Sequence, residues 1–135
     1  MSRAASRIAR NTPSAARRPD LRRAVAHLQF VRGLPCLACG RRPPSEAAHV
    51  RNGTDGATTQ KPSDKFAVPL CATCHARQHR QGELTFWSEL GIDPVDRAMR
   101  LWTVSGDPQA AERIIFRARQ RIALTALKRK AAQWG

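Results

Sequence analysis

The sequence predicts a small α+β domain in which short strands are flanked by α-helices. Its 135 residues are the length of one domain. Apolar residues recur at helical spacing near both ends of the chain, over 21–31 and again over 111–122. Between these segments, residues 47–50 and 66–70 are short β-like runs, and residues 51–64 between them have the composition of a loop.

The first predicted helix begins at Asp20, which follows Pro19 and is a typical N-cap residue. Gly33 and then Pro35 end it. Its apolar face is expected to contain Leu21, Ala24, Val25, Leu28 and Val31.

Further helices are expected over 72–80 and 84–90, with another turn or two over 95–104. The last helix is predicted over 108–133, because Asp107 can cap it and Pro108 suits the first helical position. One face of this helix carries Ala111, Ile115, Ala118 and Ile122, and another carries a basic stripe of Arg113, Arg117, Arg121 and Lys128. The stripe is either a nucleic-acid contact or a solvated face.

The net charge of +14 is concentrated in the two flanks of the chain. Residues 1–33 carry +7 and residues 94–135 carry +6, whereas residues 34–93 carry only +1. We therefore expect a flexible basic arm over 1–19, a central domain over 20–104 and a basic C-terminal helix over 105–135, with nucleic acid as the partner. Anionic lipid and plain solubility are the alternatives. No stretch is long and apolar enough for a membrane span or a secretion signal, and a cytoplasmic location is expected.

The four cysteines form two Cys-x-x-Cys pairs, which are Cys36 with Cys39 and Cys71 with Cys74. Two such turns supply the four thiolates that tetrahedral zinc prefers, and four protein ligands leave no open position for a substrate. The sequence thus predicts a structural zinc site. Two disulfides are one alternative. A c-type haem is another, since His75 follows Cys74, but it would leave the first pair unexplained.

Three histidines accompany the cysteines. His75 and His79 are four residues apart on a predicted helix, so both side chains lie on one face and can share a metal ion. His49 precedes the glycine-containing loop, where a neutral imidazole can accept a proton from water. His27, in the first helix, is interpreted as structural or exposed.

The segments LPCLACG, EAAHV and VPLCATCHARQH resemble the HNH endonucleases, which have a ββα-metal core. The continuation through GELTFWSELGIDP is similar to phage and prophage HNH proteins akin to the phage recombination-enhancement nuclease. The resemblance covers about residues 20–104. It implies a zinc-stapled ββα-metal core with flanking helices, and a cytoplasmic setting in a bacterial or phage-infected cell.

The resemblance also implies roles for single residues. His49 matches the general base, and His75 and His79 match the ligands of a catalytic Mg²⁺ or other divalent ion. The implied reaction is hydrolysis of DNA phosphodiester bonds. Asp64 is the nearest candidate to orient His49, and Arg51, beside the base, is a candidate phosphate contact.

The sequence departs from the family at two positions. Ala48 stands where many HNH enzymes have an Asp or His metal ligand, and Phe66 stands where the family usually has Asn. These departures favour the alternative function, which is a non-catalytic zinc module that binds nucleic acid.

Overall fold

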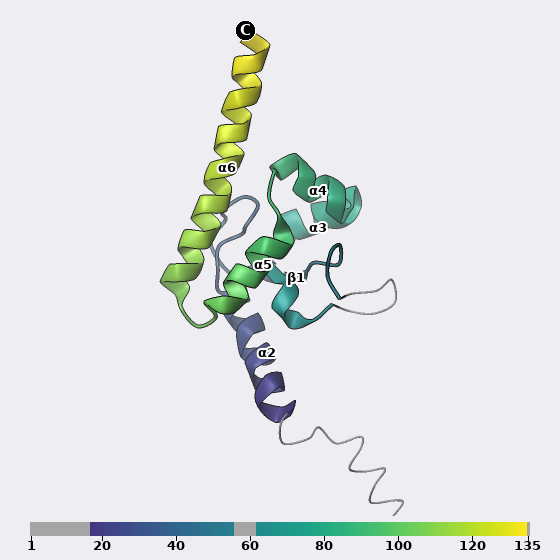
Figure 1. The fold of residues 1–135 in the computed structure, drawn as a ribbon, viewed down its shortest axis with the longest axis vertical. Helices are drawn as coiled ribbons and strands as arrows, with labels where there is room; N and C mark the ends of the chain where they lie inside the picture. Colours follow the sequence, from purple (N-terminus) through teal and green to yellow (C-terminus); the bar gives the residue numbers. More distant parts are fainter. Residues whose placement is uncertain (1–16, 56–61, 135) are drawn as a thin grey trace, which may run out of the picture.

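The computed structural model describes residues 17–55 and 62–134 and confirms a small α+β fold that is mostly helical (Figure 1). Every strand and helix expected from the sequence is present, with shifted ends. In chain order the elements are α2 (Arg17–Arg32), β1 (Glu46–His49), the 3₁₀ turn η1 (Asp64–Phe66), β2 (Ala67–Leu70), α3 (Ala72–Gln81), α4 (Glu83–Leu90), α5 (Pro94–Thr103) and α6 (Pro108–Trp134).

Helix α2 begins earlier than predicted. It starts at Arg17, so Asp20 lies in its first turn rather than at the N-cap, and its carboxylate is placed at the favourable end of the helix dipole. The basic arm predicted over 1–19 lies outside the described residues up to position 16, and its last three residues are helical.

The buried face of α2 also differs from the prediction. Leu21 and Val25 are 53% and 58% exposed, whereas His27 and Val31 are fully buried. The His27 ring is hydrogen-bonded through Nδ1 to Ser105 Oγ at 2.8 Å. This polar contact joins the buried side of α2 to the chain after α5, and apolar spacing alone does not reveal it.

The two strands form an antiparallel pair in which Glu46 is opposite Leu70 and His49 is opposite Ala67. A hydrogen bond from Val50 N to Phe66 O, at 2.8 Å, extends the pairing by one step. The end of β1 that carries His49 therefore lies beside η1, and its other end lies beside the start of α3.

The later helices begin and end where local chemistry favours it. Asp93 caps α5 by accepting hydrogen bonds from the N–H groups of Val95 and Asp96. Asp107 Oδ1 accepts from Ala110 N at 3.2 Å, which confirms the predicted start of α6. Helix α5 has ten residues and is longer than the turn or two expected.

One hydrophobic core joins these elements. Helix α5 packs against α6 on one side and against η1 and β2 on the other (Figure 1). The face of α6 predicted to be apolar is inside this core, with Ala111, Ile115 and Ala118 buried and Ile122 partly buried. The rest of α6 continues beyond the body of the domain (Figure 1). No helix in the described ranges is long and apolar enough to cross a membrane.

Candidate metal centre and histidine site

The first cysteine pair lies on a tight turn between α2 and β1. Cys36 Sγ accepts a hydrogen bond from Cys39 N at 3.5 Å, and Gly40 N donates to Cys36 O at 2.8 Å. Gly40 has a φ of +77°, which favours glycine. Leu37 N donates to Pro69 O of β2 at 2.8 Å. These bonds hold both thiols of the pair on the side of the turn that faces the second pair.

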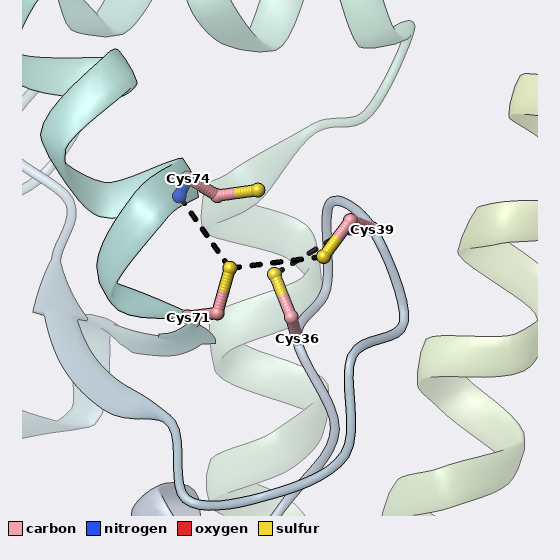
Figure 2. Close-up of side chains that lie close together, drawn as sticks. All are labelled: Cys36, Cys39, Cys71 and Cys74. Atoms are coloured by element: carbon pink, nitrogen blue, oxygen red, sulfur yellow. Dashed lines mark hydrogen bonds between the residues drawn. The ribbon is translucent and has the colours of Figure 1, made fainter.

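The second cysteine pair begins α3. Cys71 is the N-cap, and its Sγ accepts a hydrogen bond from Cys74 N at 3.4 Å. Figure 2 shows the two pairs facing each other, with Cys39 Sγ 3.7 Å from Cys71 Sγ. All four Sγ atoms lie within 4.8 Å of one another. The predicted clustering of the four cysteines is therefore confirmed.

The spacing of the four sulfurs fits zinc. A tetrahedral zinc with Zn–S bonds of about 2.3 Å places its sulfurs roughly 3.8 Å apart. The distances found require only a small contraction of the cluster. All four cysteines are free thiols, so neither predicted pair forms a disulfide. The cluster can hold a metal ion such as zinc, and four protein ligands would close its coordination.

The thiols differ in how readily they ionise. Burial raises the pKa of the Cys71 thiol, but the hydrogen bonds that it accepts from Cys74 and from the thiols of the first pair outweigh burial and lower this pKa to about 7. Burial and the neighbouring sulfurs raise the pKa of Cys74, and burial raises that of Cys39. Four thiolates so close together need a cation between them, and metal binding therefore releases protons.

His49 lies at the end of β1 and contacts Asp64, the first residue of η1. The distance from His49 Nε2 to Asp64 Oδ1 is 2.8 Å. The two side chains are 16% and 28% exposed, so the pair is partly buried but open to solvent. The structure thus brings together the histidine and the carboxylate that were named as candidate base and orienting group.

His75 and His79 lie side by side on α3, as their spacing predicts. Their ring centroids are 4.8 Å apart. His75 Nδ1 is 2.9 Å from Glu46 Oε1, at the opposite end of β1 from His49. Because the carboxylate engages Nδ1, Nε2 is the nitrogen that His75 can offer to a metal ion.

The histidine pair is not a complete metal site. Within residues 17–55 and 62–134, the four cysteines are the only group of three or more Cys, His, Asp or Glu side chains close enough to share one ion. Ala48, where many HNH enzymes have a ligand, is buried and lies opposite Val68 in the sheet. The described residues therefore supply two neighbouring histidines, one of which, His75, is hydrogen-bonded to the carboxylate of Glu46.

Arg51 follows the site on an ordered turn. The N–H groups of Arg51 and Asn52 both donate to the Glu83 carboxylate at the start of α4, each at 2.9 Å at closest. The side chain of Arg51 is exposed. Glu83 thus fixes the backbone from which Arg51 projects.

The arginines of α6 have different surroundings. Arg113 and Arg117 are exposed, in agreement with the predicted stripe. Arg121 is also exposed, but it lines a small cavity together with Asp96 and Arg97 of α5. Burial lowers the pKa of the Arg97 guanidinium, and the positive charge of Arg121 adds to this effect. Arg121 is therefore partly engaged with the body of the domain.

Sequence reasoning missed Glu46, Glu83 and Arg119. The antiparallel register could have indicated Glu46, because it lies opposite Leu70, two residues before the start of the helix that carries His75. No sequence signal indicates Glu83 or Arg119. Each acts across a tertiary contact: Glu83 on the turn after β1, and Arg119 against Gly40 of the first cysteine turn.

Comparison with known proteins gives a single family. Residues 7–99 match the family described as "Protein of unknown function (DUF968)". This match covers the cysteine cluster, His49, His75 and His79, and it ends before α6. No curated protein and no solved structure shows a significant match.

Proposed function

Because the chain belongs to the DUF968 family, whose function is unknown, its activity has to be inferred from its own residues. We propose that it is a metal-dependent endonuclease of the HNH type that hydrolyses DNA phosphodiester bonds. The observation that carries this proposal is the partly exposed His49–Asp64 pair, in a domain that also contains a cysteine cluster suited to zinc.

The chemistry proposed for the pair is general base catalysis. Hydrolysis of a phosphodiester requires a water molecule to lose a proton as its oxygen attacks phosphorus, while the bond from phosphorus to the 3′ oxygen breaks. His49 accepts that proton, and the Asp64 carboxylate orients the imidazole and stabilises the imidazolium that forms. The products carry 5′-phosphate and 3′-hydroxyl ends.

The second part of the proposal is a divalent ion, Mg²⁺ or a similar metal, held by His75 and His79. A bound divalent ion supplies Lewis-acid stabilisation of the charge that develops on the leaving oxygen. Glu46 holds the His75 ring in the orientation that presents Nε2. With only two protein ligands, the site leaves most of the metal's coordination to water and to substrate phosphate.

The order of elements supports an HNH-type core. An antiparallel strand pair is followed directly by a helix, the candidate base lies on the first strand, and the candidate metal ligands lie on the helix. A zinc ion in the cysteine cluster would hold the strand pair and the helix together, because the turn with the first cysteine pair bonds to β2 and the second pair begins α3.

The proposed partner is DNA in the cytoplasm of a bacterial or phage-infected cell. The net charge of +14 favours a polyanion, and the exposed arginines of α6 and of the turn after β1 can contact phosphates. Such contacts release counterions and carry no sequence preference.

One observation favours a second function, namely a zinc module that binds nucleic acid without cleaving it. Ala48 gives no ligand at the position where many HNH enzymes have one, and no third Cys, His, Asp or Glu among the described residues is close enough to share one ion with His75 and His79. In this case the basic surface is retained and the chemistry is absent.

A plasmid-nicking assay with Mg²⁺ or Mn²⁺ tests the proposal. We expect nicking that stops with chelator and returns when the divalent metal is restored. Substituting His49→Ala should lower the rate about 10²- to 10⁴-fold, because a positioned general base contributes that much. The zinc content and melting temperature should stay unchanged, since His49 is not part of the cysteine cluster.

The matched control is Asp20→Asn, which changes an exposed acid on α2 and should nick at the wild-type rate. Retained nicking by the His49→Ala variant would remove His49 from the mechanism. DNA binding without any nicking by the wild-type chain, under all metals, would support the non-catalytic module.

A further inference from the structure

A groove lies between α6 and the turn that carries the first cysteine pair, and the proposed cleavage chemistry does not use it. Its volume is about 710 Å³, within the range of about 300–1,000 Å³ typical of ligand sites. One wall is formed by α6, and the other by the segment between α2 and β1. Its lining includes Pro35, Gly40, Arg42, Arg113, Phe116 and Arg119.

The groove is positively charged. Arg42, Arg113 and Arg119 line it, against a single acid, Glu112. Arg42 and Arg113 are exposed, so their guanidinium groups are open to a ligand. Three arginines with one carboxylate favour an anion, and planar guanidinium groups match phosphate oxygens.

Arg119 supplies a second, independent observation. Its guanidinium lies against Gly40, where a Cβ atom would overlap it. Arg119 Nε is buried and has no hydrogen-bond partner among the described residues. An unpaired buried donor is costly. Arg119 also lines the groove, so a ligand oxygen there can bind its guanidinium.

Phe116 adds an aromatic surface to the same groove. Its side chain is 63% exposed although it lies on α6, whose opposite face is buried in the core. A phenyl ring beside arginines is the combination with which proteins hold unpaired bases, because the base stacks on the ring while the guanidinium groups bind the backbone. In duplex DNA the faces of the bases are covered by their neighbours.

We propose that this groove binds a single-stranded segment of nucleic acid, with an unpaired base stacked on Phe116 and phosphates on Arg42, Arg113 and Arg119. The inference rests on the proposed function in one respect, namely that the partner is nucleic acid. It assigns the substrate class, which is DNA with an unpaired stretch, such as a tail, flap or junction, rather than continuous duplex.

The test measures binding and not cleavage. Fluorescence anisotropy without divalent metal compares a labelled oligo-dT strand with a labelled blunt hairpin duplex, using the full chain. We expect Phe116→Ala to weaken binding of the single strand about 10-fold, as loss of one stacked base does, and to change duplex binding less than about 2-fold. Phe116→Trp should restore the single-strand affinity.

The matched control is Leu127→Ala, which removes an equally exposed apolar side chain (62%) from the same helix outside the groove. It should leave both affinities unchanged. Arg113→Gln should weaken single-strand binding and flatten its dependence on salt.

The proposal is overturned if Phe116→Ala weakens both ligands equally or neither. It is also overturned if an acidic peptide without nucleotides displaces the single strand at similar concentration. Because no cleavage is measured, selective loss of single-strand binding in a chain that never nicks DNA would reject the nuclease and keep the groove. Nicking by the wild-type chain, together with single-strand binding that Phe116→Ala does not change, would keep the nuclease and reject the groove.

Discussion

The cysteine cluster and the histidine contacts differ in how far the chain alone assembles them. The cysteines are brought together by backbone contacts that do not involve a metal: two N–H to sulfur hydrogen bonds, a helix cap and a link to β2. The histidines form two separate contacts with carboxylates, Asp64 for His49 and Glu46 for His75. On the proposed function, the first site would serve folding, whereas the second would take ligands from outside the chain.

The largest expected effect comes from removing one cysteine. Structural zinc contributes about 10–16 kcal/mol in small zinc-binding peptides, comparable to the whole stability of a typical domain. Cys71→Ser should therefore abolish zinc binding and cooperative folding. Zinc content by atomic spectroscopy and thermal unfolding by circular dichroism measure both effects.

The control for this variant is Ala72→Ser, which adds the same hydroxyl at the next, exposed position. It should bind zinc and unfold like the wild type. A Cys71→Ser chain that contains no zinc and still melts cooperatively at the wild-type temperature would show that the cluster does not serve folding.

A smaller and more selective effect is expected from the two carboxylates. In the nicking assay, Asp64→Asn should lower the rate at saturating metal about 100-fold, because it acts on the base. Glu46→Gln should instead raise the metal concentration that gives half-maximal nicking about 10- to 100-fold, because it orients a metal ligand. Titrating Mg²⁺ or Mn²⁺ against rate for each variant measures both quantities.

These two variants are each other's control. If both change the same quantity, the two histidine contacts are not separate functional pairs. Unchanged zinc content in both would confirm that the cysteine cluster is independent of them.

The smallest expected effect concerns His27, which is buried against both Ser105 and Trp102. Burial, and then the charge of Arg23, lower the pKa of His27 below its ordinary value of 6.5. Between these two pKa values the unfolded chain binds more protons than the folded one, so the free energy of unfolding falls as the pH drops below 6.5.

Replacing this side chain tests that dependence. His27→Gln should reduce the loss of stability between pH 7.5 and mildly acidic pH, because the variant has no imidazole to protonate at this position. Urea unfolding at several pH values, with excess zinc, measures it in both proteins. Protonation of the cysteines affects the wild type and the variant alike. Equal pH dependence of the free energy of unfolding in the two proteins would therefore exclude His27 as the source of that dependence.

Much of the site could be predicted because its signals are local. The Cys-x-x-Cys spacing fixes which sulfurs face each other, and the i, i+4 spacing fixes that His75 and His79 share a face. The start of α6 at Pro108 follows from its capping residue Asp107. Such features depend on a few neighbouring residues.

The parts that could not be predicted depend on packing between distant segments. On the inward side of α2, His27 bonds Ser105, which is 78 residues away. The position of Arg119 depends on the bare backbone of Gly40. Neither contact has a sequence pattern, because each exists only once the elements have assembled.

The hydrogen bond from Leu37 N to Pro69 O has a consequence for self-association. It covers the edge of β2 that faces away from β1, and Pro69 offers no N–H of its own there. An uncovered strand edge is a template for pairing with another chain. If loss of zinc releases the first cysteine turn, it also exposes this edge. The metal-free chain is then expected to aggregate through β2, and a zinc ion bound by the cysteine cluster would protect solubility as well as shape.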